Sequence, residues 1–354
     1  MRKMRFTHLT RFATLTALTV IAAPLALAGC SASDGADLTT VTVVTHDSFD
    51  VPEDVLADFE RESGLTVTFV APGDAGALVN QLILTQDSPL GDVVFGIDNT
   101  FASRAIDAGV LSPVDIMAPA FEDAATYGIP GSDRLVAIDY SDVCINVDHR
   151  WFTEHELAEP VTLADLTRPE YKGLLSVPNP ATSSPGLAFL LATVASDPEH
   201  WEEYWAALRA NDVRVVASWS DAYFTDFSGP STGGDYPLVV SYASSPPFEV
   251  GDTGEAPTGA LLETCFRQVE YAGVLAGGQN PDGARLVIEW MLSDAFQSSV
   301  AESMYVYPVS TTAEIPESWV EFAPLSEEPW TITPDEIAAH RDEWIRTWTS
   351  VVLD

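Results

Sequence analysis

The chain has 354 residues, of which 53 are acidic and 16 are basic, so its formal net charge is −37. A surface this acidic repels nucleic acid and favours cationic ligands, although acidity also serves solubility. Hydrophobic residues make up 46% of the chain, and its length argues against one small domain and for two lobes.

Residues 1–29 have the pattern of a secretory signal peptide. Four basic residues precede an apolar stretch over 12–27, which is too short for a permanent membrane span. The stretch ends in Leu-Ala-Gly-Cys, which resembles a bacterial lipobox, so we expect Cys30 to be acylated and to become the mature N-terminus. A plain signal peptide with an incidental cysteine is the alternative. Residues 30–38 are predicted to form a flexible tether.

The first third of the remaining chain alternates strand-like and helix-like segments. Strands are expected at 41–45, 66–70 and 92–97, and helices at 52–63, after the N-cap candidate Asp74, and before Gly109. This alternation predicts a parallel α/β sheet. Polar groups follow its strands at Asp47, at the Asp74 turn, and at Asp98 with Asn99.

The middle third repeats this logic. A strand at 174–177 leads into a hydroxyl-rich loop, where Ser184 suits a helix cap and Pro185 suits the first helical turn. Such a loop presents hydroxyls and backbone N–H groups to a polar ligand. A helix at 201–210 and a strand at 213–216 are expected to follow.

The stretch over 218–246 has the pattern of a ligand-binding edge. Trp219 precedes a loop rich in Gly, Ser and Pro, and the apolar run 238–240 ends in Tyr242 and small hydroxyl residues. Ligands of open α/β sheets bind beyond the carboxyl ends of strands, and the two aromatic rings offer faces for stacking. Core packing of both rings is the alternative.

The last third is mostly helical. Helices are expected at 281–292 and 294–302, followed by an extended segment at 304–309. A capping box with proline in the first turn begins a terminal helix at Thr333. Trp344 and Trp348 lie four residues apart on that helix, which favours a role in core packing.

Two cysteines remain besides Cys30. Cys144 and Cys265 each lie in a β-like segment, and an even pair in an exported protein predicts a disulfide between neighbouring strands. Two buried free thiols are the alternative.

Searches for catalytic motifs find none. The sequence has no nucleophile elbow, zinc-protease helix, phosphate-binding loop or dinucleotide fingerprint, and a total of six histidines argues against a histidine-rich metal site. We therefore expect a solute receptor rather than an enzyme, without a metal or a cofactor.

Seven short motifs, taken in chain order, resemble those of the thiamine-binding proteins of bacterial ABC importers, a branch of the type II periplasmic binding proteins. They are THDSF at 45–49, DVVFGIDN at 92–99, DY at 139–140, TSSPG at 182–186, WSDAY at 219–223, SYASSP at 241–246 and YPV at 307–309. The resemblance covers nearly the whole mature chain.

The resemblance implies two α/β lobes with a ligand cleft between them. Lobe 1 would comprise 39–142 and the return segment 265–354, and lobe 2 would comprise 143–264. Ligand contacts would fall on Asp74, Ala75, Ser183, Ser184, Trp219, Tyr242, Ala243, Ser244 and Ser245, and on Tyr305, where the family usually has tryptophan.

The implied ligand is thiamine or its phosphates, and its thiazolium cation suits aromatic faces and carboxylates. Asp74 or Asp98 would face the cation, and Asp47 is a further acidic candidate. The expected partners are ABC permease subunits and the outer face of the cytoplasmic membrane, through a lipid anchor on a monomer.

Three alternatives stay open at this point. A polyamine receptor would also use acids and aromatic rings. A ferric-ion receptor of the same superfamily usually has a Tyr-Tyr pair, which this chain lacks. A secreted α/β hydrolase would need a nucleophile–base pair or a metal cluster, and the sequence motifs provide neither.

Overall fold

A computed structural model describes residues 38–251 and 254–354 of the chain. The predicted signal peptide, the acylation site Cys30 and all but the last residue of the tether lie outside the described residues. The predicted boundaries of the two lobes stay a prediction.

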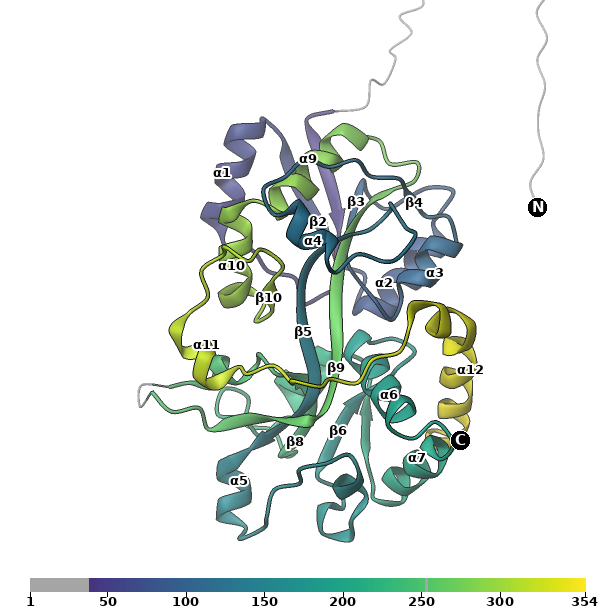
Figure 1. Cartoon of the computed structure of the whole chain (residues 1–354), viewed down its shortest axis with the longest axis vertical. Helices are drawn as coiled ribbons and strands as arrows, with labels where there is room; N and C mark the ends of the chain where they lie inside the picture. The colour runs from purple at the N-terminus through teal and green to yellow at the C-terminus, as the bar shows by residue number, and fades with distance from the viewer. Residues whose placement is uncertain (1–37, 252–253) are drawn as a thin grey trace, which may run out of the picture. The chain divides into compact units, whose positions relative to one another are not determined.

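One sheet contains the ten strands of the described residues (Figure 1). The order across the sheet is β2-β1-β3-β9-β5-β8-β6-β7, with β4 beside β9 and β10 beside β5. In chain order the strands are β1 (Thr40–Val44), β2 (Thr66–Val70), β3 (Val93–Asp98), β4 (Leu111–Ser112), β5 (Val136–Asp148), β6 (Leu175–Pro178), β7 (Arg214–Val216), β8 (Leu238–Tyr242), β9 (Thr258–Leu275) and β10 (Tyr307–Pro308).

The sheet is mixed, which corrects the prediction of a parallel sheet. β1 runs parallel to β2 and β3, and β6 runs parallel to β7 and β8. The two long strands β5 and β9 run antiparallel to each other, and they pair antiparallel with β8 and β3 respectively. Alternation along the sequence did not reveal this, because β9 pairs with strands that lie far earlier in the chain. Figure 1 shows β5 and β9 side by side, linking the two halves of the sheet.

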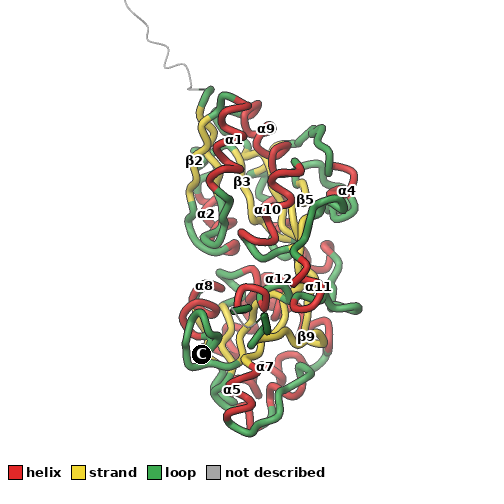
Figure 2. The backbone as a smooth tube through the Cα atoms, turned by 90° about the vertical axis from the view of Figure 1, so that its left-hand side faces the viewer, coloured by secondary structure: helices red, strands yellow, loops and turns green. Residues whose placement is uncertain are grey.

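Helices surround the strands (Figure 2). The α-helices are α1 (Glu53–Ser63), α2 (Ala75–Leu84), α3 (Ala102–Asp107), α4 (Phe121–Ala125), α5 (His149–Glu154), α6 (Ser184–Ser196), α7 (Trp201–Ala210), α8 (Trp219–Asp221), α9 (Pro281–Met291), α10 (Asp294–Ser303), α11 (Glu317–Phe322) and α12 (Pro334–Val352). Short 3₁₀ helices are η1 (Ala164–Thr167), η2 (Pro169–Tyr171) and η4 (Pro246–Glu249), and η3 (Ala222–Asp226) is a π-helix.

The starts of the helices largely follow the predicted caps. Asp74 caps α2, and the side chain of Thr333 accepts a hydrogen bond from the Glu336 N–H at the start of α12. The predicted cap of α6 was one residue off, because Ser183 caps this helix and accepts from the Gly186 N–H. Ser184 is the first helical residue, and its hydroxyl donates to Asp98 instead.

The predicted disulfide is present. Cys144 on β5 and Cys265 on β9 are both fully buried, and they are bonded to each other across a sequence separation of 121. The bond therefore joins the two long strands that carry the chain between the halves of the sheet.

The terminal helix α12 packs through tryptophan, as predicted. Trp348 is fully buried and meets Trp205 of α7 edge to face, at 5.5 Å between ring centroids. Trp344 is half-buried against the core. The guanidinium of Arg341 lies over the ring of Phe101, which directly precedes α3, so α12 contacts elements of both predicted lobes.

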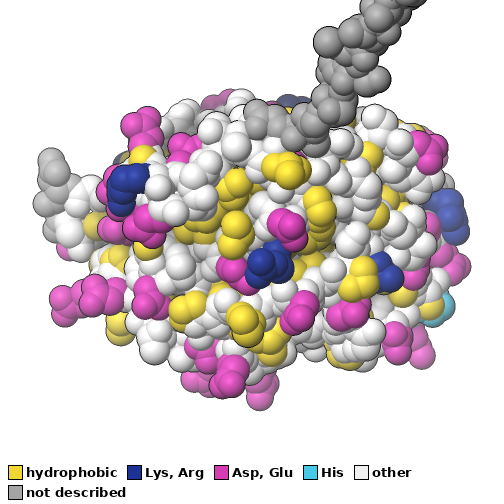
Figure 3. All heavy atoms as spheres, turned by 90° about the horizontal axis from the view of Figure 1, so that it is seen from above, with side chains coloured by type: hydrophobic (Ala, Val, Ile, Leu, Met, Phe, Trp, Pro, Cys, Tyr) yellow, Lys and Arg dark blue, Asp and Glu magenta, His cyan; other side chains and the backbone are white. Residues whose placement is uncertain are grey.

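The surface matches the acidic composition. Figure 3 shows one face, on which Asp and Glu side chains are scattered and Lys and Arg side chains are few. Over 38–251 and 254–354, no helix combines the length and the apolar character needed to cross a membrane.

Candidate ligand-binding site

A pocket of about 310 Å³ collects side chains from both halves of the sheet. Its walls come from the ends of β1 and β8, from β9, and from the starts of α2, α6 and α8. The turns η3 and η4, the last residue of α10 and the segment after it complete the walls. The lining residues are His46, Asp47, Ser48, Asp50, Asp74, Ala75, Ser184, Pro185, Trp219, Ser220, Tyr223, Phe224, Tyr242, Ser245, Phe248, Glu270, Ser303, Met304, Tyr305 and Val306.

Asp74 holds three helix starts together at one side of the pocket. Its Oδ1 accepts hydrogen bonds from the N–H groups of Ala75 (2.6 Å) and Ser184 (3.4 Å). Its Oδ2 accepts from the N–H of Trp219 at 2.9 Å. Burial raises the pKa of Asp74 above its ordinary value, while the N–H groups of Trp219 and Ala75 and the hydroxyl of Ser183 lower it. The carboxylate thus satisfies backbone donors that helix starts otherwise leave unpaired.

The backbone of the first half approaches that of the second very closely at this point. The N–H of Ala77 donates to the carbonyl of Thr182 at 3.2 Å. A Cβ at Gly76 would lie 2.7 Å from the Thr182 carbonyl carbon, which is closer than real Cβ atoms come. Glycine at this position therefore lets the start of α2 sit directly on the loop before α6.

Asp98 lies behind Ser184 and does not line the pocket. Its carboxylate is fully buried and accepts hydrogen bonds from the hydroxyls of Ser184 and Thr100 and from the Phe101 N–H. Burial raises the pKa of Asp98 to about 7, although the hydroxyls of Ser184 and Thr100 lower it. Asp98 therefore holds the hydroxyl of Ser184, which lines the pocket, and does not line the pocket itself.

Six aromatic side chains, which we name the aromatic belt, form a continuous wall. Trp219 stacks on Tyr223 with ring centroids 5.3 Å apart, and it meets Phe224 and Tyr242 edge to face. Phe248 links Phe224 to Tyr305, also through edge-to-face contacts. The indole N–H of Trp219 donates to the Ser241 hydroxyl at 2.9 Å, which fixes the orientation of the ring. The aromatic belt thus comprises Trp219, Tyr223, Phe224, Tyr242, Phe248 and Tyr305.

Tyr305 has an unusual backbone conformation. Its φ is 55°, a left-handed value that costs free energy for a residue other than glycine. The buried hydroxyl of Ser244 donates to the Tyr305 carbonyl at 2.6 Å and stabilises this conformation. The prediction of an extended segment over 304–309 was therefore wrong for its first part, and only Tyr307 and Pro308 form a strand.

A buried pair of titratable groups, His46 and Glu270, also lines the pocket. The Nε2 of His46 lies 3.6 Å from Oε1 of Glu270, and its Nδ1 accepts a hydrogen bond from the Ser48 N–H. Burial lowers the pKa of His46, but the Glu270 carboxylate and the nearby Asp74 and Asp47 raise it above its ordinary value overall. Burial raises the pKa of Glu270, but His46 brings it below its ordinary value overall.

Asp139 lies beside this pair, in register with Glu270 across β5 and β9. It is fully buried, and burial together with the neighbouring Glu270 carboxylate raises its pKa well above the ordinary value. Of these two carboxyl groups, Glu270 lines the pocket and Asp139 does not.

The structure brings together most of the predicted site residues. Eight of them line the pocket: Asp47, Asp74, Ala75, Ser184, Trp219, Tyr242, Ser245 and Tyr305. Four do not line it: Ser183 caps α6, Ala243 packs beside the disulfide, Ser244 supports Tyr305, and Asp98 lies below Ser184.

Sequence reasoning missed several lining residues. Glu270 lies within a long strand that carries no local signal, and only its register with β5 and β3 reveals it. Tyr223 lies within a quoted motif, and its spacing from Trp219 could have indicated a stacked pair. Phe224 and Phe248 are 48% and 38% exposed, and unusual exposure cannot be read from a sequence.

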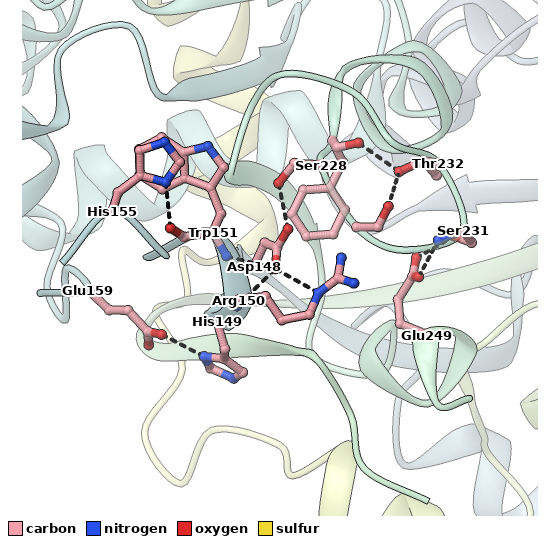
Figure 4. Close-up of polar contacts among 12 residues, drawn as sticks. Asp148, His149, Arg150, Trp151, His155, Glu159, Ser228, Ser231, Thr232 and Glu249 are labelled. Carbon is pink, nitrogen blue, oxygen red and sulfur yellow. Dashed lines mark hydrogen bonds and ion pairs between the residues drawn. The ribbon is translucent and has the colours of Figure 1, made fainter. Parts of the chain in front are cut away.

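The loop rich in Gly, Ser and Pro does not line the pocket. Its serine hydroxyls donate to buried carboxylates (Figure 4). Buried Glu249 accepts hydrogen bonds from the backbone and hydroxyl of Ser231, and also from the Tyr223 hydroxyl. The Ser228 hydroxyl donates to Asp148, which caps α5. This loop therefore braces the back of the aromatic belt rather than contacting the pocket.

The charges of the pocket favour a cation with aromatic character. Four acidic residues and six aromatic residues line it, and none of its lining residues is Lys or Arg. Aromatic faces attract cations by about 0.5–2 kcal/mol each. Among the described residues, no cluster of His, Cys, Asp and Glu could hold a metal ion.

The buried titratable groups predict a pH dependence of stability. An unfolded Asp98 would lose its proton near its ordinary pKa, 3.8, and the folded protein keeps it up to about 7. The unfolded state therefore binds fewer protons over this interval, and the free energy of unfolding should fall as pH rises, by at most about 1.4 kcal/mol per pH unit. The raised pKa of His46 acts in the same direction, because its contribution is lost as pH rises through the folded value.

Urea unfolding of the parent and of Asp98→Asn at several pH values between 5 and 8 measures how the free energy of unfolding depends on pH. The variant should show a flatter dependence, while Asp107→Asn, a change at an exposed helix end, should keep the parent slope. Equal slopes in parent and Asp98→Asn would contradict the assignment.

Solved structures define the class of protein. A periplasmic thiamin-binding protein superposes with a TM-score of 0.78 at 26% identity, covering 89% of this chain and 96% of that one. A ferric-binding protein from Bordetella superposes with a TM-score of 0.62 at 20% identity, covering 88% and 98%. The fold is that of the type II periplasmic binding proteins.

Sequence comparisons identify the family. The chain belongs to the family of bacterial extracellular solute-binding proteins, whose model matches residues 88–331. The thiamine-binding periplasmic protein of Brucella suis biovar 1 is 28% identical over 319 residues, which are 87% of this chain and 91% of that protein. The protein of the same name from Escherichia coli K12 is 28% identical, covering 88% and 93%.

Proposed function

We propose that this chain is the receptor that captures thiamine for an ABC importer. The observation that carries the proposal is one pocket that combines the aromatic belt with four carboxyl groups and has no Lys or Arg among its lining residues. The names of two relatives and of one structural neighbour support the same ligand.

The chemistry of thiamine matches the two sides of the pocket. Thiamine is an aminopyrimidine ring joined to a positively charged thiazolium ring that bears a hydroxyethyl arm. The aromatic belt would stack with the rings, and Glu270 with Asp74 would supply negative potential. Of these groups, Trp219 and Tyr242 would provide the main stacking faces, from different strand ends that meet at the pocket.

The proposed mechanism is binding and release without a chemical step. Lobe closure would trap the ligand between the two halves of the sheet, and the closed receptor would then dock on a permease. Contacts from Asp74 to the N–H groups of Ser184 and Trp219 would form in the closed state, because they join elements of the two halves.

Native mass spectrometry of the protein as purified tests the proposal. A receptor of this kind should carry one molecule with the mass of thiamine or a derivative, or take up one when thiamine is added. A chain that retains a polyamine and ignores thiamine would contradict the proposed ligand. A chain that converts its ligand would contradict the role as a receptor.

We also propose that the protein is exported and anchored by a lipid on Cys30. The apolar leader and the Leu-Ala-Gly-Cys motif support this, and both lie outside the described residues. Cys30→Ser should be released from the membrane fraction or remain unprocessed, as immunoblots of fractionated cells would show. A variant that fractionates and migrates like the parent would contradict the anchor.

A further inference from the structure

We propose that Ser141 is a positioning residue for the ligand pocket, because its hydroxyl acts through that of Ser244 to hold Tyr305 in place. Ser141 lies on β5 and does not line the pocket, whereas Tyr305 is the last member of the aromatic belt. This inference rests on the proposed function and deepens it, since it names contacts behind the pocket that retain a bound ligand.

Ser141 lies where one edge of β5 changes its neighbouring strand. Along the other edge, β5 pairs with β9 over most of its length. On this edge, β10 pairs with Asp139 and Tyr140, at the level where β9 pairs with β3 of the first half of the sheet. From Val143 onward, β8 of the second half takes the place of β10 (Figure 1). The two halves therefore meet on this edge at Ser141 and Asp142.

A chain of hydroxyl groups crosses this junction. Continuing the antiparallel register of β5 and β8 by two residues places Ser244 opposite Ser141, and their Oγ atoms lie 2.6 Å apart. Between them and β8, the N–H of Ala243 donates to the carbonyl of Asp142 at 2.8 Å. The Ser244 hydroxyl donates to the carbonyl of Tyr305 at 2.6 Å.

The direction of this chain follows from the number of protons. A carbonyl oxygen can only accept, so the single hydroxyl proton of Ser244 is used on Tyr305. The contact between the two serines must then be donated by Ser141. Both serines are buried, and hydrogen bonds in series strengthen one another in a buried environment. We name this chain, from Ser141 through Ser244 to the Tyr305 carbonyl, the hydroxyl relay.

Tyr305 needs this support because its backbone is strained. Its φ of 55° costs free energy for a residue with a side chain, and such conformations persist where the surroundings hold them. The ring is held separately: buried Trp319 of α11 stacks on it at 6.3 Å between centroids, and Phe248 of η4 meets it edge to face at 5.1 Å. The hydroxyl relay therefore fixes the backbone of Tyr305, while two aromatic neighbours fix its ring.

The position of the hydroxyl relay indicates when it acts. Ser244 follows β8 of the second half, and Tyr305 precedes β10 at the level of the first half. Like the contacts of Asp74 between the halves, the bond from Ser244 to Tyr305 would form on closure. Opening must then break it before the ligand leaves. Its loss should therefore speed dissociation and leave association nearly unchanged, which a general loss of stability would not do.

Stopped-flow measurement of thiamine binding, followed by tryptophan fluorescence, tests the inference. Ser141→Ala should raise the dissociation rate constant about five-fold, as expected for the loss of one buried hydrogen bond. Ser244→Ala removes both bonds and should raise it at least about ten-fold. The association rate constant should stay within about two-fold of the parent value. An unchanged dissociation rate constant in Ser141→Ala would overturn the inference and leave the proposed function standing. Failure of the parent to bind thiamine would overturn both.

A double-mutant cycle tests whether Ser141 acts through Tyr305. Tyr305→Gly removes the ring and permits the left-handed backbone without strain. Adding Ser141→Ala to this variant should leave the dissociation rate constant where Tyr305→Gly alone puts it. Ser176→Ala is the matched control, because it removes a buried hydroxyl on β6 that donates to Asp226 at 2.7 Å outside the pocket. It should lower the melting temperature and keep the parent's rate constants. A full effect of Ser141→Ala in the Tyr305→Gly protein would overturn the role of Ser141 in positioning Tyr305.

Discussion

Replacement of Cys144 and Cys265 by alanine is expected to lower the free energy of unfolding by about 4–5 kcal/mol. The bond closes a loop with a sequence separation of 121, so its loss restores much conformational freedom to the unfolded chain. Both side chains are fully buried between β5 and β9, so alanine should avoid a new buried polar group. Urea unfolding of the parent and the double variant measures the difference.

Reduction of the parent provides the matched control for this prediction. With reductant present, the parent should unfold close to the double variant, because both then lack the same constraint. Thiol titration of the denatured, unreduced parent should detect no thiol from this pair. If two thiols react, or if reductant leaves the parent's unfolding curve in place, the bond makes no such contribution.

Trp219→Ala is expected to weaken thiamine binding by about 2 kcal/mol or more, which is about 30-fold. Trp219 lies at the centre of the aromatic belt and contacts Tyr223, Phe224 and Tyr242. Its removal takes away a stacking face and also leaves the Ser241 hydroxyl without the indole donor. Calorimetric titration of the parent and the variant measures the loss.

Two further variants separate this loss from a general loss of stability. Trp219→Phe keeps an aromatic face and should lose less affinity than the alanine variant. Trp344→Ala removes a half-buried tryptophan from α12, so it should lower the melting temperature and leave the affinity of the folded fraction nearly unchanged. Parent-like affinity in Trp219→Ala would remove Trp219 from the site.

Local signals in the sequence were enough to place several parts of the site. A carboxylate before a helix identified Asp74 as an N-cap, and cysteines in two β-like segments of an exported chain identified the disulfide. Trp219 and Tyr242 were found because small polar residues and a short apolar run flank them. Each of these features depends on neighbours within a few residues, so each is visible in the sequence.

The features that the sequence did not reveal depend on contacts between distant segments. Glu270 faces the pocket because β9 pairs antiparallel with β3 and β5, and the alternation of strands and helices had predicted a parallel sheet. The sequence analysis predicted that Asp98 would contact the ligand, but Asp98 binds the hydroxyl of Ser184 and does not line the pocket. Tyr305 adopts its left-handed conformation where Ser244, from another segment, holds its carbonyl.

Calorimetric titration of the purified mature protein with thiamine tests the central claim most directly. The account predicts saturable binding of one thiamine per chain, and weaker binding of a neutral aminopyrimidine that lacks the thiazolium cation. The absence of binding to ligand-free, folded protein at millimolar thiamine would contradict the assignment of this pocket to thiamine.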